Sequence, residues 1–586
     1  MKVFLCDLVH NQVLGENQIS EAADFVVPLG IASIASFLKD NFGRPLEVSI
    51  FKYPDKLLSA INTDAPDVIG FSNYSWSEDL NRRIGSEIKR RYPNILTVMG
   101  GPSIRTESEG ITQFLRNNSH IDVYVMFEGE RPFLELLQLF AAEGREFLER
   151  PTSIPSCAYL LGDTLVYTPS NQDGAISEFS SPYLNGMLGE FLTAGLIPLL
   201  ETNRGCPFQC TFCTWGISAL NKVRQHSLDR VYQEFDYVSR NFPDLPSWIL
   251  ADANFGILKR DIDIAQKLSE IRGRTPSLRR IVLWESKNTS DRNFEIARLM
   301  GNDVGDVLMA VQTLDPITQE AIKRDNIGLD HVPDKIDRFH DLGAMVQTHV
   351  LSGLPGETYQ AHLETLRKCF NLGFDHVHVF STLLLPGSEM ETDESREKYG
   401  ITTKYRLRQG AYGEYHGIRS IDAEEIIRET TAINESEMLH LRPVHWLIWH
   451  GWNHGFLKPM LRYAHREHGI NPLDMILEIF DRSENGQYPK LGQLFSQFLA
   501  DAKLEWFDTY ESLSKFYTSP DNWDSLINNG FIKVEFKYNA LMILNPSWYS
   551  EMLDLIAEIV TQRVPSSQIN QLIGPLKEIM IDPETL

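Results

Sequence analysis

Short apolar runs alternate with amphipathic segments through the first 150 residues of the chain. Apolar runs of this length flanked by turn residues predict strands, and apolar positions three or four residues apart predict helices. The pattern predicts strands at 2–9, 46–51, 68–72, 95–100 and 123–127, and helices at 31–39, 80–91 and 132–142. Strands that alternate with helices form a parallel, doubly wound sheet. We therefore predict an α/β, Rossmann-like domain over residues 1–150.

The same alternation returns between residues 194 and 400. It predicts strands at 196–202, 248–251, 280–285, 307–313, 346–351 and 376–383. Six β/α units are too few for a closed eight-stranded barrel, so the pattern predicts a partial (β/α)6 TIM-type barrel. Residues 151–193 are rich in proline and have little periodicity, which predicts a linker.

Charged and aromatic helical segments dominate residues 401–586, for which we predict a mainly helical domain with a substrate-capping role. The pattern predicts helices at 422–441 and 472–481, and a strand pair at 531–536 and 540–544. The aromatic group at 445–452 is interpreted as core packing.

Composition narrows the possible partners. The formal net charge is −24 and basic residues do not cluster, so nucleic acid is not an expected partner. Half of the six cysteines lie in one short stretch, which indicates a reducing environment rather than a disulfide framework. The sequence has no apolar run long enough for a membrane span and starts without a signal-peptide pattern, so we expect a cytoplasmic protein.

The most informative feature is the CxxxCxxC triplet of Cys206, Cys210 and Cys213. Three thiolates at this spacing hold three irons of a [4Fe–4S] cluster and leave the fourth iron without a protein ligand. A structural zinc site is the alternative, but zinc needs four closed ligands, and no second CxxC or HxxxH follows at finger spacing.

This triplet, with Phe212 before the last cysteine, resembles the signature of the radical S-adenosylmethionine (SAM) enzymes. Four phrases resemble landmarks of that family's barrel in the expected order: Asp252–Gly256, Gln312–Asp315, Gly353–Glu357 and Leu385–Ser388. The resemblance implies that SAM chelates the open iron and is cleaved to methionine and a 5′-deoxyadenosyl radical. It also implies SAM contacts by Phe212, Trp215, Asn254, Glu285, Gln312, Gly353 and Leu354.

The first 150 residues resemble the cobalamin-binding domain of B12-dependent radical SAM enzymes. The resemblance rests on Pro28–Gly30, Gly70–Trp76, Gly100–Gly101 and Phe127–Glu130. It implies cobalamin contacts by Ser72, Asn73, Tyr74, Trp76, Gly100, Gly101, Glu128 and Gly129. The DxHxxG motif, whose histidine ligates cobalt in many such domains, is missing. We interpret His10 as a structural histidine, and Trp76 is our candidate for the lower face of cobalt.

Together these features resemble the cobalamin-dependent radical SAM methyltransferases. The resemblance implies methylation of an unactivated carbon by methylcobalamin and a 5′-deoxyadenosyl radical. The implied partners are a small-molecule or peptide substrate, such as a natural-product intermediate, and an electron donor such as flavodoxin or ferredoxin.

Four alternatives stay open at this point. A cobalamin-dependent radical SAM oxidoreductase or cyclase would keep both cofactors without methyl transfer. An RNA methylthiotransferase would need three more N-terminal cysteines and a basic RNA-binding end. A cobalamin sensor would give the cysteine triplet no function. The fourth alternative is a radical SAM enzyme whose N-terminal domain no longer binds B12.

Overall fold

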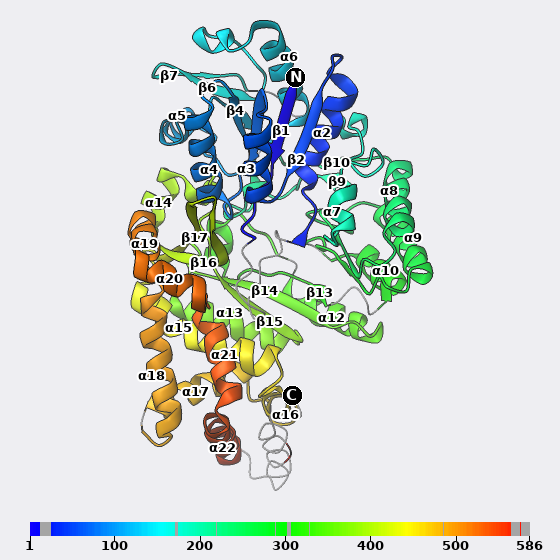
Figure 1. Cartoon of the computed structure of the whole chain (residues 1–586). Coiled ribbons are helices and arrows are strands. Elements are labelled where there is room, and N and C mark those ends of the chain that lie inside the picture. Colours follow the sequence, from blue (N-terminus) through cyan, green and yellow to red (C-terminus); the bar gives the residue numbers. More distant parts are fainter. Residues whose placement is uncertain are drawn as a thin grey trace.

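The computed structural model describes residues 1–11, 25–169, 174–217, 220–287, 289–301, 306–326, 328–484, 486–563 and 575. The N-terminal sheet lies at one end of the molecule, the barrel strands lie in the middle, and the C-terminal helices lie at the other end (Figure 1). None of the described helices combines the length and the apolarity that crossing a bilayer requires.

The N-terminal domain is a parallel sheet covered by helices on both faces. Its five parallel strands run in the order β2-β1-β3-β4-β5. Their bounds are β1 Lys2–Cys6, β2 Glu47–Phe51, β3 Val68–Ser72, β4 Leu96–Gly101 and β5 Val123–Met126. The helices are α2 Leu29–Asn41, α3 Pro54–Thr63, α4 Glu78–Arg91, α5 Ser108–Asn117 and α6 Glu130–Glu143. The predicted doubly wound sheet is confirmed.

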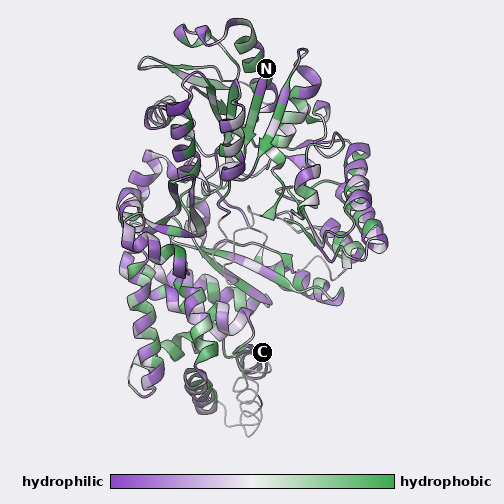
Figure 2. Cartoon of the chain, viewed as in Figure 1, coloured by the Kyte–Doolittle hydropathy of each residue, from purple (hydrophilic) through white to green (hydrophobic). Residues whose placement is uncertain are grey.

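Both faces of this sheet are apolar. Val3 and Leu5 of β1 join one buried cluster, whereas Phe4 and Cys6 join another on the opposite face. A strand buried on both faces is a continuous apolar run, and for this reason the sequence pattern located these strands well. The strands of this sheet are accordingly coloured as hydrophobic in Figure 2.

The predicted linker at 151–193 contains two further strands, so that prediction was wrong for its first part. Strands β6 Cys157–Leu161 and β7 Thr164–Tyr167 extend the N-terminal sheet in antiparallel fashion beyond β5. Gly162 turns this hairpin with a φ of 58°. The hairpin is short and follows two prolines, which hides its alternation within a proline-rich stretch.

Six short parallel strands form the barrel in two sheets of three, ordered β12-β11-β8 and β13-β14-β15. They are β8 Leu199–Leu200, β11 Ser247–Leu250, β12 Arg280–Val282, β13 Val307–Leu308, β14 Val346–Ser352 and β15 His376–Ser381. The helices outside them are α8 Leu228–Asn241, α9 Asp261–Arg274, α10 Asp291–Met300, α11 Pro316–Ala321, α12 Val332–Asp341 and α13 Tyr359–Leu372. The predicted partial barrel is confirmed.

A long antiparallel hairpin of β16 Thr402–Tyr415 and β17 Ile418–Glu429 opens the C-terminal region. The helix predicted at 422–441 was therefore wrong in its first half, and α15 Glu435–Leu447 begins only after the hairpin. The acidic residues at 424–425 favoured a helix locally, but the pairing partner of this segment, β16, outweighs that preference. The hairpin lies against α4, and Ile426 of β17 forms a bridge with Leu383 in the segment that follows β15.

The helices that follow confirm the mainly helical C-terminal region. They are α16 Lys458–His468, α17 Pro472–Glu484, α18 Pro489–Leu504, α19 Tyr510–Tyr517, α20 Pro520–Asn529, α21 Val534–Leu544 and α22 Pro546–Arg563. The strand pair predicted at 531–544 was wrong, because α21 buries Val534, Tyr538 and Met542 at helical spacing. The aromatic group at 445–452 packs in the core as predicted, with Trp446 and Trp452 buried.

Candidate cofactor and substrate site

The three cysteines lie together on the loop between β9 Asn203–Arg204 and a short 3-10 turn at Thr214–Gly216. Burial raises the pKa of Cys213 to about 11, and the neighbouring Cys206 and Cys210 add to the rise, which places the three thiols near one another. A Cβ on Gly216 would lie 2.4 Å from the carbonyl oxygen of Cys210, so glycine lets the loop close tightly.

Two side chains from the barrel bond to these thiols. Nδ2 of Asn254 donates to Sγ of Cys206 at 3.2 Å, and Nη1 of the buried Arg324 donates to Sγ of Cys210 at 3.7 Å. Burial lowers the pKa of Arg324, and the three cysteines oppose that change. A guanidinium at this position stabilises thiolates over thiols. The sequence analysis predicted Asn254 at this site and missed Arg324, which belongs to no motif.

The thiol arrangement fits a cluster better than a single ion. In the part of the chain that the structure describes, no three His, Cys, Asp or Glu side chains converge closely enough to hold one metal ion. Each thiolate of a [4Fe–4S] cluster binds a different iron, so its ligands need not converge on one point. Three neighbouring thiols with a buried cation beside them therefore suit the predicted cluster.

The other predicted SAM residues lie at the carboxyl ends of the barrel strands. The carboxylate of Glu285 accepts from the backbone nitrogen of Leu308 at 3.4 Å, and burial raises its pKa to about 7. Gln312 has a φ of 62°, and its buried Oε1 has no hydrogen-bond partner among the described residues. A strained backbone and an unsatisfied acceptor at one residue are typical of ligand sites. We infer that Gln312 is the better SAM candidate of the two.

Gly353 and Leu354 connect this edge of the barrel to the cysteine loop. Gly353 has a φ of 84°, a Cβ there would lie 2.8 Å from the side chain of Met438, and its N–H donates to Glu357 at 3.1 Å. Leu354 is fully buried in a cluster that also receives Phe212. Trp215 is 41% exposed.

The glycines of the N-terminal domain allow close contact between loops. A Cβ on Gly101, at a φ of 135°, would lie 2.7 Å from the carbonyl oxygen of Asn73, and one on Gly100 would lie 3.0 Å from that of Val125. The side chain of Asn73 donates to the carbonyl oxygen of Ser103 and to the hydroxyl of Tyr124. The side chain of Asn73 thus holds the loops together. We therefore propose that Asn73 contacts cobalamin through its backbone.

The carboxylate predicted to contact cobalamin is engaged elsewhere. Glu128 forms ion pairs with Arg224 and, at 3.5 Å, with Arg204, while Glu130 pairs with Arg204 at 3.0 Å. A Cβ on Gly129 would lie 2.5 Å from the side chain of Ile34. Glu128 thus joins the N-terminal domain to Arg204 and Arg224, whereas Gly129 packs within the domain against α2.

Tyr74 and Trp76 form a platform after β3. Their rings stack with centroids 4.3 Å apart and an angle of 7° between planes, and Trp76 is partly exposed. The preceding Ser72 bonds to the carboxylate of Asp7 and helps to lower its pKa, although burial raises that pKa overall. A flat, partly exposed aromatic surface suits the role proposed for Trp76 below the cobalt.

His10 is buried and fully bonded. Its Nε2 lies 2.8 Å from a carboxylate oxygen of Asp422, and its Nδ1 lies 3.1 Å from the hydroxyl of Tyr415. The same carboxylate of Asp422 accepts from the backbone nitrogen of Asp79 at 2.8 Å. Both ring nitrogens are occupied, which supports the structural interpretation of His10.

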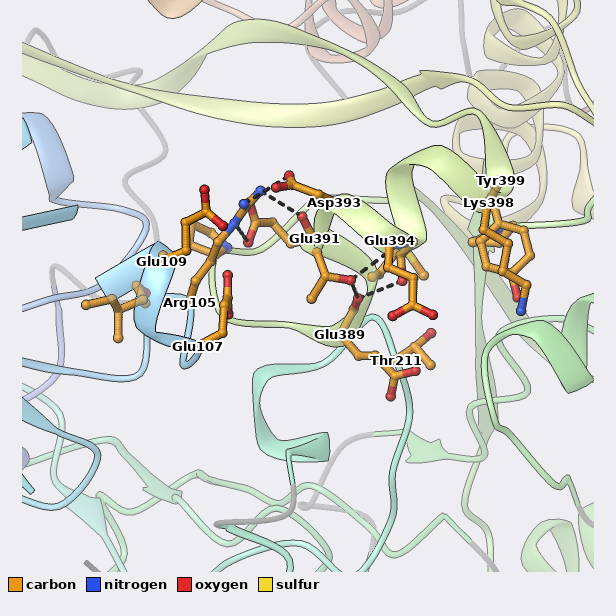
Figure 3. A pocket seen from close by; sticks show the side chains of 18 of the residues that line it. Arg105, Glu107, Glu109, Thr211, Glu389, Glu391, Asp393, Glu394, Lys398 and Tyr399 are labelled. Atoms are coloured by element: carbon orange, nitrogen blue, oxygen red, sulfur yellow. Dashed lines mark hydrogen bonds and ion pairs between the residues drawn. The ribbon is translucent and has the colours of Figure 1, made fainter. Parts of the chain in front are cut away.

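A cavity of about 840 Å³ lies between the loop after β4, the cysteine loop and α14 Asp393–Tyr399 (Figure 3). Arg105 spans it by pairing with Glu391 and Asp393, and Thr211 of the cysteine loop lies on its wall. None of the predicted site residues is among the described residues that line it. Its many carboxylates disfavour an anionic occupant.

Two family models match separate parts of the chain: the B12 binding domain at residues 19–137 and the Radical SAM superfamily at residues 200–398. In sequence the chain is similar to the cobalamin-dependent radical SAM methyltransferases. It is 31% identical over 382 residues to the cobalamin-dependent radical SAM methyltransferase TokK of Streptomyces tokunonensis. It is 30% identical over 386 residues to the 2-(S-pantetheinyl)-carbapenam-3-carboxylate methyltransferase of Streptantibioticus cattleyicolor.

These alignments cover 63% and 64% of the chain, which spans 54% and 55% of the length of the two relatives. The solved structure of OxsB, a cobalamin-dependent SAM radical enzyme with aqua-cobalamin bound, shares the fold. Its TM-score is 0.54 at 13% identity, over 99% of this chain and 84% of the other. The two domains account for the expected cofactors, which are cobalamin, a [4Fe–4S] cluster and SAM.

Proposed function

We propose that the protein methylates an unactivated carbon of a small molecule or natural-product intermediate. The main support is the contact between its two cofactor domains. Arg204, two residues before the first cysteine of the triplet, is held by Glu128 and Glu130 at the carboxyl end of β5. The cobalamin-type edge of the N-terminal sheet and the cysteine loop are therefore fastened side by side.

When bound, the cofactors supply a 5′-deoxyadenosyl radical and a transferable methyl group. The chain's own residues hold and orient them. Cys206, Cys210 and Cys213 hold the cluster, and Arg324 stabilises the thiolate form of Cys210. The unpartnered oxygen of Gln312 would accept a hydrogen bond from SAM, and the ring of Trp76 would contact cobalamin. Fixed geometry is the protein's main catalytic contribution, since the radical attacks any nearby C–H bond.

The names of the matched relatives suggest a first trial substrate. One of them is named for methylation of 2-(S-pantetheinyl)-carbapenam-3-carboxylate. We propose this compound for a first assay, and flavodoxin or ferredoxin as the electron donor.

The experiment is an anaerobic assay of protein reconstituted with iron, sulfide and hydroxocobalamin. We expect about four irons and one cobalt per chain, and both S-adenosylhomocysteine and 5′-deoxyadenosine in the presence of SAM and reductant. Cys210→Ala should abolish both products, whereas Cys369→Ala, a buried cysteine on α13 outside the loop, should retain them. Iron without cobalt would contradict the proposal.

A second candidate is an oxidoreductase or cyclase that uses the same cofactors without methyl transfer. Formation of 5′-deoxyadenosine without S-adenosylhomocysteine in the same assay would favour that reading over methyl transfer.

A further inference from the structure

Two adjacent barrel strands turn one face toward the outer helices and the other toward the barrel interior. Val346 and Val350 of β14 and Val377 of β15 are buried in the core formed with α12 and α13. Side chains alternate across a strand, so the residues between them face the interior. These interior residues are Gln347, His349 and Leu351 on β14, and His376, His378 and Phe380 on β15.

The parallel register places the two sets side by side. His349 pairs with His378, and Leu351 pairs with Phe380. The His349 ring lies edge-on to both neighbours, with centroids 5.8 Å from His378 and 5.0 Å from Phe380. The interior face of this half of the barrel is therefore a patch of imidazoles bordered by an aromatic ring.

The interior of the barrel leaves large aromatic side chains uncovered. Phe380 is 47% exposed, and Trp284, which follows β12, is 46% exposed. The neighbours of Trp284, Ile281 and Leu283, are buried against the outer helices, so Trp284 also faces inward. A TIM barrel normally fills its interior with side chains. Here two aromatic rings from opposite halves of the barrel are available to contact a ligand.

The two imidazoles beside Phe380 form no hydrogen bond with the described part of the protein. Burial lowers the pKa of His349 to about 4, with a smaller effect of His378, and burial also lowers the pKa of His378. Both are neutral near pH 7 and able to donate or accept hydrogen bonds. Among the described residues, no group of three His, Cys, Asp or Glu side chains is placed to hold a metal ion.

The surrounding charges favour an anion over a cation. The ionisable groups that affect the pKa of His378 are His376, Asp306 and His454. Asp306 is already paired with His376. Among the described residues, the electrostatic partners of His378 include no unpaired carboxylate that would attract a cation. A carboxylate oxygen can accept a hydrogen bond from the N–H of a neutral imidazole, and this bond is charge-assisted because the acceptor is ionised.

We propose that His349 and His378 bind a carboxylate group of the substrate, while Trp284 and Phe380 contact its apolar part. This inference rests on the proposed function, because it assigns the barrel interior to the substrate. It narrows the substrate class to carboxylic acids with an apolar portion. The two imidazoles determine specificity, and they take no part in the transfer step.

The test measures binding rather than turnover. Phenylacetate, indole-3-acetate and octanoate, each paired with its amide, are titrated calorimetrically into the cluster- and cobalamin-loaded protein at pH 6.5. We expect at least one acid to bind at least tenfold more tightly than its amide. That preference should fall below threefold in a His349→Gln/His378→Gln variant.

The matched control is His340→Gln, because His340 lies on α12 outside the barrel and pairs with Asp375. It should retain the preference. Equal binding of acid and amide by the unmodified protein, absence of acid binding, or a preference that survives the double substitution would overturn the inference. If the double variant loses iron or cobalt, the two single variants carry the test, each with a partial loss of preference.

The proposed function is judged separately on the same preparations. Release of 5′-deoxyadenosine from SAM reports the radical chemistry and does not depend on acid binding. A double variant that still cleaves SAM but has lost the acid preference supports the inference on its own. Unmodified protein that binds the acids but cleaves no SAM would contradict the proposed function and leave the carboxylate site standing.

Discussion

Among the described residues, Arg324 alone donates a charge-assisted hydrogen bond to a thiol of the cysteine triplet. It is buried, and it also bonds to the carbonyl oxygen of Ala310 and the side chain of Asn326. Its position is thus fixed independently of the cluster. A buried cation held against three thiols lowers the free energy of their ionised form.

Arg324→Gln should weaken the cluster site. A hydrogen bond to a charged group contributes about 1.5–3 kcal/mol, so we expect iron to be lost to a chelator roughly 10- to 100-fold faster. Iron release followed by absorbance measures this. The control is Arg338→Gln, which removes an exposed ion pair with Asp291 on the outside of the barrel. Equal release rates for both variants would show that Arg324 serves the fold alone.

At the residue scale, the sequence was a better guide to which residues could hold a cofactor than to which residues contact one another in the fold. Motif spacing located the loops that carry the cysteines, Asn254 and Gln312, and their roles in binding cofactors stay predictions. The partners of Glu128 and His10 could not be found, because Arg224 and Asp422 are distant in sequence and only the folded chain brings them together. The alternation of side chains along β14 and β15 could have identified His349 and His378 as residues that face the barrel interior.

The hairpin of β16 and β17 joins the N-terminal domain to the barrel. Asp422 of β17 accepts hydrogen bonds from the backbone nitrogens of Asp79 and Leu80, and so acts as a cap for α4 from another part of the chain. The carboxylate of Asp79 in turn accepts from Ser420 and Ile421 of β17. A carboxylate at a helix N-terminus is stabilised by unpaired N–H groups and by the helix dipole.

Asp422→Ala should loosen this junction. It leaves buried N–H groups of α4 and the ring of His10 without their partner, at a cost of about 1–3 kcal/mol for each unsatisfied group. We expect faster backbone hydrogen exchange in α4 and in the loop after β1. Glu429→Ala, an exposed residue at the end of the same strand, is the control. Unchanged exchange in α4 would argue against the capping role.

Elements were predictable where local pattern and tertiary pairing agree. The doubly buried strands of the N-terminal sheet meet that condition. The hairpin at 402–429 and helix α21 do not, because acidic residues in β17 favour a helix locally and the apolar run in α21 imitates a strand. The pairing of β17 with the preceding β16 decides the first, and packing of α21 against α18 and α22 decides the second.

At the scale of the whole molecule, the two cofactor domains meet through a very close backbone approach. Gly387, in the loop after β15, has a φ of 83°, and a Cβ there would lie 2.6 Å from the carbonyl oxygen of Ile104 and 2.7 Å from that of Pro102. The Arg105–Glu391 pair fastens the same two loops. Glycine at position 387 therefore sets the distance between the cobalamin-type domain and the barrel.

Gly387→Ala should push these loops apart, because it adds a methyl group against backbone and strains a left-handed φ. We expect several-fold faster loss of bound cobalamin on dilution, with iron content unchanged, since the cysteine loop lies on the barrel side. Gly273→Ala on α9, where a Cβ meets nothing within 4 Å, controls for the added methyl group. Loss of iron and cobalamin together would indicate general unfolding, whereas retention of both would mean that the interface tolerates a wider separation. The selective loss of cobalamin is the result that a shared site between the domains requires.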